Sequence, residues 1–388
     1  MKGCEARRET AEDPARASVA RRTKKARGAP YEVGAPPRLP PAKDPGSAAI
    51  VSTMRSPGAH LDPWLRWHAA LGFERFYLFV DADTSEEERA RVTSHPGVRV
   101  VVVDRRMRAR MVRDAYSAPL VPLCGAPEEP VTSGEQLTAR QLCNVKMALG
   151  MAQRDGVAWL LHIDVDELFL PREQGFRASS SPSGRGPSRA PARAHFAAMH
   201  DLGIGYAIYD NHEALCEEAS YEHPLRDITL FRKNPRAIDP EAFAQAEPYF
   251  AERGGFFLAY ANGKAAVRVV PGAEPAGVHG FHVPLELEFG RVRLLSPAIL
   301  HYPYTNFDAY HRKFRRIADR PEEVLLGRKW SPPLFEIASR DVVRAGGERE
   351  VRAFYERAVV VRDPARIKGW LRSGVLARIT APSRFFGG

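Results

Sequence analysis

The sequence predicts an α/β fold, with a mostly parallel sheet flanked by helices and a helical C-terminal cap. Three observations support this prediction. Short apolar runs alternate with helical patterns, as in AAIVSTM, LDPWLRWHAAL and RFYLFV. The apolar runs lack polar alternation, which is typical of parallel strands buried on both faces. Helical patterns return near the C-terminus, in TNFDAYHRKFRRIAD and EREVRAFYERAVV.

The elements are expected in a regular order up to residue 163. Asp62 and Pro63 open the first helical pattern, and both residue types favour a helix start. The expected elements are strand 48–54, helix 61–71, strand 75–80, helix 85–92, strand 98–103, helix 135–154 and strand 158–163. After residue 204 the apolar runs are short, and they suit strands and irregular loops better than further regular βα units.

Composition places the chain among folded proteins. It has 388 residues, of which 44% are hydrophobic and 27% are charged. The net charge of +10 is concentrated in two stretches: residues 1–50 hold 11 Lys and Arg against 6 Asp and Glu, and residues 172–193 hold five Arg against one Glu. We interpret both as solvated basic segments, so no nucleic-acid partner is expected. The predicted organisation is a disordered basic tail at 1–47, a domain at 48–310 with a flexible insertion at 172–193, and a helical extension at 311–388.

Other patterns exclude several classes of protein. The four Cys residues form no C-x-x-C pair, which argues against a zinc ribbon or a disulfide-stapled scaffold. Nothing in the sequence resembles a nucleophile elbow or a phosphate-binding P-loop. No stretch reaches the roughly 18 consecutive apolar residues of a membrane span, and no signal-peptide apolar region is visible. We expect a cytoplasmic location, with the Golgi as the alternative if the chain is N-terminally incomplete.

The segment WLLHIDVDELFLP contains the sharpest chemical signal. Its apolar run predicts a buried strand, and Asp164, Asp166 and Glu167 follow immediately. In open parallel sheets, ligands bind beyond the carboxyl ends of the strands. Two carboxylates one residue apart supply the hard oxygen ligands that suit Mg²⁺ or Mn²⁺ bridging a diphosphate. The alternative is that the acidic group only caps the next element.

These stretches resemble a known family, the GT-A-fold nucleotide-sugar glycosyltransferases of the family-2-like and family-92-like group. MRSPGAHLDPWLRWHAALGFERFYLFVDADT is similar to the family's first βαβ unit, and RQLCNVKMALGMAQRDGVAWLLHIDVDELFLP to the helix and strand that deliver its metal motif. The likeness continues through YDNHEAL, DITLFRKN, GKAAVRV, GVHGFHV and LHYPYTNFDAYHRKF, and reaches about residue 385. It implies Mn²⁺- or Mg²⁺-dependent transfer of a hexose or pentose, with inversion, from a nucleotide-sugar donor to a hydroxyl of a glycan, protein or lipid.

The resemblance also assigns the metal ligands. Asp164 and Asp166 match the metal motif and would hold the divalent ion with the donor diphosphate. His279 would complete the coordination, because two glycines near it allow close backbone approach. His282 and His301 have weaker claims, and all three histidines have a structural role as the alternative.

The residues expected to contact the nucleotide donor are Asp81, Asp83, Arg140, Gln141, Asn144, Lys264 and Arg268. Asp81 and Asp83 would meet the base and ribose, where a carboxylate can accept both ribose hydroxyls; the alternative is a polar loop that leads to a helix capped by Ser85. Lys264 and Arg268 could neutralise the leaving diphosphate as cations that need no metal.

Two other groups of polar residues are open to more than one interpretation. Arg140 and Asn144 share one face of the predicted helix, and that face meets either the substrate or solvent. The arginines after the VRVVVV run could meet phosphates but are better explained as a solvated face; they are Arg105, Arg106, Arg108 and Arg110. For the base that deprotonates the acceptor hydroxyl we select Glu213, with Asp227 behind it, although either can instead fix a loop.

Two alternatives to a glycosyltransferase remain open. One is a catalytically silent protein of the same fold that binds a glycan or a partner. The other is a nucleotidyltransferase, which would prefer nucleoside triphosphates. The glycine-rich phosphate loop expected of the latter near its first strand is missing, because MRSPGAH supplies a single glycine.

Overall fold

The computed structural model describes residues 44–54, 61–82, 84–127, 129, 134–171, 190–318 and 333–387. Contacts between residues divide the chain into units 1–38 and 39–388, and all described residues belong to the second. Most of the predicted tail and insertion, and Asp83, lie outside the described residues. No helix in the described part of the chain combines the length and apolar character that crossing a bilayer requires.

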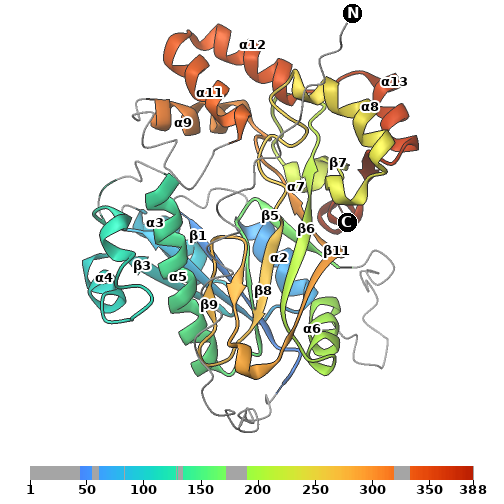
Figure 1. Cartoon of the computed structure of the whole chain (residues 1–388). Coiled ribbons are helices and arrows are strands. Elements are labelled where there is room, and N and C mark those ends of the chain that lie inside the picture. Colours follow the sequence, from blue (N-terminus) through green and yellow to red (C-terminus); the bar gives the residue numbers. More distant parts are fainter. Residues whose placement is uncertain are drawn as a thin grey trace, which may run out of the picture. The chain divides into compact units, whose positions relative to one another are not determined.

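Ten of the described strands form one sheet (Figure 1). They are β1 (Ala48–Met54), β2 (Arg75–Asp81), β3 (Val98–Val103), β4 (Trp159–His162), β5 (Glu167–Leu170), β6 (Ile204–Ala214), β7 (Leu230–Arg232), β8 (Lys264–Arg268), β11 (Gly290–His301) and β12 (Leu376–Arg378). The order along the main path is β12-β7-β6-β8-β4-β1-β2-β3, and β11 pairs with both β5 and β6. The short strands β9 (Glu274–Pro275) and β10 (Phe281–His282) pair separately.

The predicted parallel sheet is present in the N-terminal half of the fold. Strands β4, β1, β2 and β3 run parallel to one another. In the other half, β8 runs antiparallel to both β4 and β6, and β7 runs antiparallel to β6 and β12. Strand β11 runs parallel to β6, so the sheet is mostly parallel, as expected. The antiparallel pairs have a physical reason. Parallel neighbours need long crossovers, usually helical, and the short runs after residue 204 permit antiparallel returns.

Helices cover both faces of the sheet. They are α2 (Leu61–Leu71), α3 (Glu86–Thr93), α4 (Arg105–Met111), α5 (Gly134–Asp155), α6 (Pro191–Asp201), α7 (Pro224–Asp227), α8 (Pro240–Ala251), α9 (Phe307–Ala318), α11 (Leu334–Ala345), α12 (Glu348–Val359), α13 (Pro364–Arg372) and α14 (Ala381–Gly387). Alternate residues of β1 enter two different cores: Ile50 packs in the cluster that contains α2 and α6, and Val51 packs in the cluster that contains α5. The α/β layering expected from the apolar runs is therefore confirmed.

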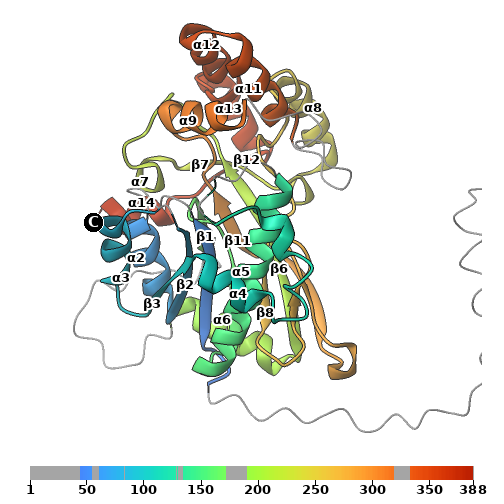
Figure 2. The same ribbon diagram turned by 90° about the vertical axis from the view of Figure 1, so that its left-hand side faces the viewer.

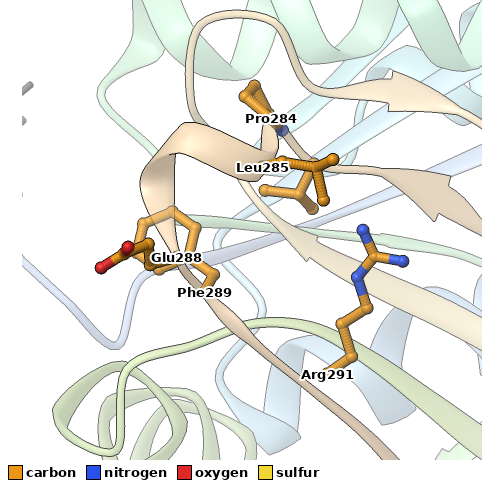
Figure 3. A pocket seen from close by; sticks show the side chains of 6 residues that line it. Pro284, Leu285, Glu288, Phe289 and Arg291 are labelled. Carbon is orange, nitrogen blue, oxygen red and sulfur yellow. The ribbon is translucent and has the colours of Figure 1, made fainter. Parts of the chain in front are cut away.

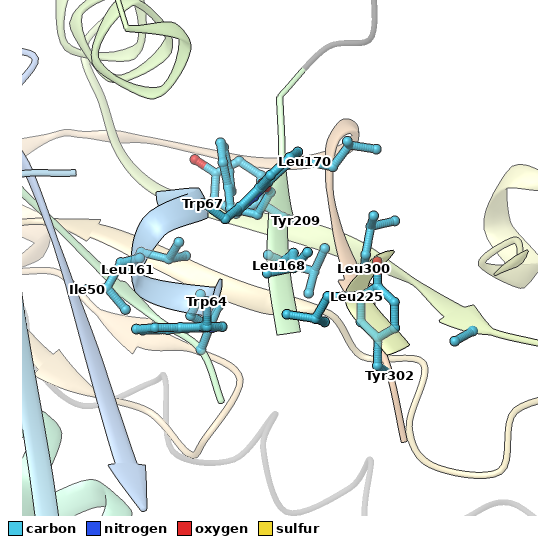
Figure 4. Packing of buried hydrophobic residues seen from close by; sticks show 14 of the residues in the cluster. Ile50, Trp64, Trp67, Leu161, Leu168, Leu170, Tyr209, Leu225, Leu300 and Tyr302 are labelled. Carbon is cyan, nitrogen blue, oxygen red and sulfur yellow. The ribbon is translucent and has the colours of Figure 1, made fainter. Parts of the chain in front are cut away.

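Helix α2 fixes the strand that follows the acidic motif. The indole N–H of Trp64 donates to the Glu167 carbonyl at 2.7 Å, and that of Trp67 donates to the Phe169 carbonyl at 2.9 Å. The same two rings lie in the apolar cluster with Leu161 and Leu168 (Figure 4). Burial of these large rings therefore also sets the position of β5, which begins at Glu167.

The predicted C-terminal helices are present and share the main core. Helix α9 contacts α11 and α12 (Figure 2). Aromatic contacts join these helices, including Phe314 with Phe335 and Phe307 with Tyr355. Phe314, Phe335 and Tyr355 lie in the same buried cluster as β1. A second group of helices, α8 and α13, packs with β7 and β12 in a smaller cluster. The helical extension is thus packed on the α/β part of the chain.

Two boundaries differ from the sequence prediction. Asp44 to Ser47 belong to the fold, since the Ser47 hydroxyl accepts the Ala158 N–H at 3.0 Å. The second boundary is the C-terminal end of the predicted insertion at 172–193. Residues 191–193 begin α6, and Arg193 forms ion pairs with Asp44 and Glu74. These arginine contacts stabilise a helix start that an Arg/Ser/Pro-rich sequence obscures.

Candidate active site

The acidic motif, which consists of Asp164, Asp166 and Glu167, lies where the ends of four strands meet. It connects the end of β4 to the start of β5. Antiparallel pairing places the start of β8 beside the end of β4, with His162 opposite Ala265, so Lys264 reaches the motif. Pairing of β11 with β5 sets His301 opposite Glu167. Sheet register therefore brings together groups that are far apart in the sequence.

Lys264 and Asp164 form a buried ion pair. The Lys264 ammonium donates to Asp164 Oδ2 at 2.5 Å and lies 3.5 Å from Glu167 Oε2. Burial would raise the pKa of the Asp164 carboxyl, but Lys264 outweighs it and lowers that pKa to about 2. Burial likewise opposes the charge on Lys264, and the two carboxylates hold its pKa above the ordinary value. Both groups are therefore charged at neutral pH.

Glu167 completes this buried network. One of its oxygens accepts the Asp164 backbone N–H at 2.8 Å, and the other accepts the Tyr260 hydroxyl. Burial raises the pKa of Glu167 to about 7, against the opposing effect of Lys264. Because Glu167 has no exposed surface, its role is to shape the turn that presents the two aspartates.

Asp166 is the open member of the motif. Its side chain is 49% exposed, and His301 Nε2 lies 3.6 Å from its Oδ2. Burial opposes protonation of His301, but Asp166 and Glu167 outweigh it and raise the pKa of the imidazole. His301 Nδ1 is buried without a hydrogen-bond partner among the described residues. Asp166 and His301 thus face each other across a gap at the edge of the site.

Tyr260 and two further imidazoles surround the cluster. The Tyr260 ring centre lies 4.8 Å from that of His301 and 4.6 Å from that of His279. His279 Nδ1 is bonded to the Gly263 carbonyl at 2.7 Å, and burial lowers its pKa to about 4. Burial also lowers the pKa of His162 to about 3, so both imidazoles are neutral at pH 7. Tyr260 was not indicated by any sequence pattern.

The polar face of α5 is buried against the rest of the fold, so the solvent-facing interpretation does not hold; contact with a substrate stays a prediction. Gln141 donates to Asp164 Oδ1 at 3.3 Å, and Asn144 donates to the Thr53 hydroxyl at 3.0 Å. Arg140 donates to Asp81 Oδ2 at 3.2 Å and also bonds three backbone carbonyls, those of residues 124, 126 and 129. Arg140 therefore connects the end of β2 to the loop before α5.

Four buried polar side chains hold the segment 256–263. Glu213 accepts the Leu258 and Ala259 N–H groups at 2.8 and 2.9 Å, and Arg232 lies 2.8 Å from Glu213 while it donates to the Phe256 carbonyl. The other two members are Asn211, which bonds the backbones of residues 260 and 263, and Asn234, which bonds that of residue 261. This clamp fixes the segment that delivers Tyr260 and Lys264.

Several sequence predictions do not fit this arrangement. Glu213 has no exposed surface and its oxygens are occupied, so the geometry does not support it as the base. Asp227 lies on α7 and makes two hydrogen bonds with Arg226. Arg268 pairs with Trp159 at the start of β4 and contacts His200, so the structure does not bring it to the acidic motif. A sequence cannot tell which end of a strand a cation occupies before the strand's direction is known.

The arginines after β3 agree with the solvated interpretation. They form α4, whose N-cap Asp104 accepts the Met107 N–H at 2.7 Å. Arg105, Arg106 and Arg110 are exposed on this helix. His282 also has an exposed side chain, on β10.

A surface hollow lies at the other end of β11 from His301. Pro284, Leu285, Glu288, Phe289 and Arg291 line it (Figure 3). Because β11 begins at Gly290, next to Arg291, and ends at His301, the length of a strand separates this hollow from the acidic motif. The hollow does not combine convergent polar groups in the way the motif does.

Comparison with curated proteins shows similarity to glycosyltransferase-like proteins. No protein-family model matches the chain. The chain is 27% identical over 327 residues to glycosyltransferase-like At3g57200 of Arabidopsis thaliana, and 28% identical over 328 residues to glycosyltransferase-like At2g41451 of the same plant. Both matches cover 82% of this chain, which spans 59% and 67% of the length of those two proteins.

Solved structures give a weaker likeness. S. aureus TarS is 10% identical with a TM-score of 0.30, and the matched region covers 83% of this chain and 82% of that chain. The mannosyltransferase PcManGT from Pyrobaculum calidifontis, solved with GDP-Man and Mn²⁺, is 11% identical with a TM-score of 0.30, and the matched region covers 93% of this chain and 86% of that one. These scores are too low to support a functional inference. Similarity to proteins named as glycosyltransferase-like therefore rests on the sequence matches, over 82% of the chain.

Proposed function

We propose that this protein is a GT-A-type glycosyltransferase that moves a sugar from a nucleotide diphosphate to an acceptor hydroxyl. The observation that supports it most is the acidic motif at the carboxyl end of parallel strand β4, with Asp166 open and Asp164 paired to Lys264. Ligands of parallel sheets bind at this edge. The sequence matches to glycosyltransferase-like proteins, over 82% of the chain, support the same class.

We assign different roles in the proposed transfer to Asp81, Asp166 and Lys264. Asp81, held by Arg140 at the end of β2, meets the nucleotide, and the diphosphate lies beyond the end of β4. A divalent ion bound at Asp166 would neutralise charge that develops on the leaving diphosphate. Lys264 keeps Asp164 ionised and fixed beside the same place.

The side chains at the acidic motif are chemically suited to hold a divalent metal ion. Among the described residues no three His, Cys, Asp or Glu side chains are grouped as a metal site. Mg²⁺ and Mn²⁺ sites that bind phosphorylated substrates do not require three, because substrate oxygens and water complete the coordination. Asp166 supplies a hard, half-exposed carboxylate, and His301 presents Nε2 toward it. These side chains therefore fit a divalent ion whose remaining ligands come from the substrate and water.

Calorimetric titration with UDP, GDP, CDP and the corresponding triphosphates, each with and without Mn²⁺, tests the proposal. We expect one of these nucleotides to bind, more tightly with the metal, and Asp166→Asn to remove the effect of the metal. Asp201→Asn is the matched control, because Asp201 is exposed at the end of α6. Binding of no nucleoside diphosphate would favour the catalytically silent alternative, and a preference for a triphosphate would favour a nucleotidyltransferase.

A further inference from the structure

Two arginines from distant parts of the chain meet at one buried carboxylate. Arg236 lies in the short helix Pro235–Ala237, Arg293 lies on β11, and the carboxylate belongs to Asp210 on β6. Arg293 Nη1 donates to Asp210 Oδ1 at 2.5 Å, and Arg236 Nη1 lies 3.5 Å from the same oxygen. Asp210 has no exposed surface, while the side chains of Arg236 and Arg293 are 51% and 37% exposed. The buried carboxylate therefore anchors two cations that reach the surface.

The same two arginines also hold the backbone that leads to Lys264. Arg236 Nη1 donates to the Ala261 carbonyl at 3.2 Å, and Arg293 Nη1 donates to the Asn262 carbonyl at 3.3 Å. Both carbonyls belong to the segment 256–263, which the buried polar clamp already fixes. The guanidinium groups are therefore positioned before any ligand binds, and this lowers the entropy that binding costs.

Each arginine leaves one edge of its guanidinium group free. Every hydrogen bond that these two side chains donate to a described residue comes from Nη1. The opposite edge carries the Nε–H and an Nη2–H, and these two donors match two oxygens of a carboxylate or a phosphate. Arg236 and Arg293 thus present paired, charge-assisted donors of the kind that bind oxyanions.

The balance of charge at the arginine pair favours an anion. Arginine stays protonated in proteins, so Arg236 and Arg293 bring two positive charges to the single negative charge of Asp210. Among the described residues, the ion pairs of both arginines lead to Asp210. Two guanidinium groups at one carboxylate oxygen repel each other, and their repulsion is only partly offset by that carboxylate. A bound anion would supply the missing negative charge.

The order of strands places the arginine pair beside the acidic motif, on the side away from Asp81 (Figure 1). In the order β6-β8-β4-β1-β2, Asp210 on β6 is two strands from β4 in one direction, and Asp81 on β2 is two strands from it in the other. The pairing of β8 with both of its neighbours sets Asp210 level with Asp164. Neighbouring strands are about 4.8 Å apart, so the backbones of Asp210 and Asp164 are about 10 Å apart.

We propose that Arg236 and Arg293 form an oxyanion site for a carboxylate or phosphate group on the acceptor. The assignment to the acceptor rests on the proposed function: the nucleotide meets Asp81 on one side of the acidic motif, and the acceptor then lies on the β6 side. Uronic acids and sugar phosphates carry groups of this kind. The arginine pair selects such acceptors over neutral ones, because a neutral sugar leaves the paired donors without an anion.

Ligand-observed NMR titration measures the oxyanion site without a donor or a metal. Full-length protein, in a metal-free buffer that contains no phosphate or carboxylate ions, is titrated with methyl glucuronide, glucose 6-phosphate and neutral methyl glucoside. We expect at least one charged sugar to bind about tenfold or more tightly than methyl glucoside, because charged hydrogen bonds are worth that much or more. The two charged probes distinguish a carboxylate from a phosphate.

Two substitutions in the arginine pair and one control locate the binding. Arg236→Gln removes a charge at a half-exposed position, and Arg293→Lys keeps a charge beside Asp210 but removes the planar fork. We expect each to weaken binding of the charged sugar by about tenfold. Arg291→Gln is the matched control, because Arg291 is exposed two residues earlier on β11 and forms no ion pair with a described residue. At 0.15 M salt its affinity should stay within about twofold of the wild type, since distant surface charges are screened.

Melting curves establish that each variant is folded. If Arg293→Lys fails to fold, Arg236→Gln decides, because the Arg236 side chain is half exposed and donates one hydrogen bond to a described residue, at the Ala261 carbonyl. Equal affinity for charged and neutral sugars, unchanged binding in either folded variant of the pair, or an equal loss in Arg291→Gln each overturns the oxyanion site.

Transfer assays with charged and neutral acceptors separate this inference from the proposed function. If the charged sugar binds as expected but no nucleotide sugar glycosylates any acceptor, the oxyanion site stands and the proposed function fails. If the wild type and Arg236→Gln both glycosylate charged and neutral acceptors at equal rates, the proposed function stands and the assignment of the site to the acceptor is wrong.

Discussion

Replacing Lys264 with methionine tests the buried ion pair that shapes the site. Methionine keeps most of the apolar stem and removes the charge. In the wild type the ammonium lies 2.5 Å from Asp164 and 3.5 Å from Glu167, with 1% of the side chain exposed. Removal of one partner of a buried ion pair costs about 3–5 kcal/mol. The Asp164 side chain is 27% exposed and regains some hydration, so we expect the lower end, about 3 kcal/mol.

Urea unfolding of both proteins at pH 8 in EDTA measures this cost. The matched control is Lys146→Met, because Lys146 pairs with Glu274 at 3.1 Å on a partly exposed surface. Such pairs contribute about 1 kcal/mol or less. A Lys264→Met protein as stable as the control variant would refute the argument, since Asp164 and Glu167 would then need no cation between them.

Three further predictions concern the buried side chains of His68, Glu213 and Arg140. Burial lowers the pKa of His68 to about 3, below its value in the unfolded chain. The unfolding free energy should therefore fall by up to about 1.4 kcal/mol per pH unit as the pH drops from 6.5 toward 3. In urea denaturation at a series of pH values, His68→Gln should reduce this dependence on pH. Glu213→Gln should lower the free energy of unfolding by about 3 kcal/mol, because it breaks the buried ion pair with Arg232. A fall in kcat of about a hundredfold or more with an unchanged melting temperature would instead identify Glu213 as the base. Arg140→Met should destabilise by about 3 kcal/mol in thermal unfolding, because it removes the buried hydrogen bonds that Arg140 donates to Asp81 and to three carbonyls. Full stability would contradict a structural role for Arg140.

The acidic motif was predictable because all of its signals are local. An apolar run ends and the carboxylates follow within a few residues, so strand, strand end and chemistry can be read together. The inward face of α5 was also accessible, as one of two interpretations of its polar stripe. The partners of the motif were harder to identify. Lys264 is 100 residues from Asp164 in the sequence, and their contact depends on the antiparallel register of β8.

The sequence predictions that do not fit the structure concern residues whose position depends on strand register. Lys264 and Arg268 look equivalent in NGKAAVRV, yet a strand of this length places them at opposite ends of the sheet. Glu213 lies in a polar cluster that favours a catalytic role, but β6 turns its carboxylate into the core toward Arg232. His279 stays a predicted metal ligand; its Nδ1 is bonded to the Gly263 carbonyl, and the β11–β5 pairing brings His301 to within 3.6 Å of Asp166. Each case depends on strand register, which residue patterns do not specify.

Turnover of nucleotide sugars tests the central claim most directly. Full-length protein with Mn²⁺ is incubated with a panel of UDP-, GDP- and CDP-sugars and a mixture of glycan acceptors, and released nucleoside diphosphate and new glycan masses are measured. We expect one donor class to be consumed with equal amounts of diphosphate and glycosylated product, Asp166→Asn to reduce the rate by about a hundredfold or more, and Asp201→Asn to leave it unchanged. Absence of turnover for every donor, or equal rates for the wild type and Asp166→Asn, would contradict the account.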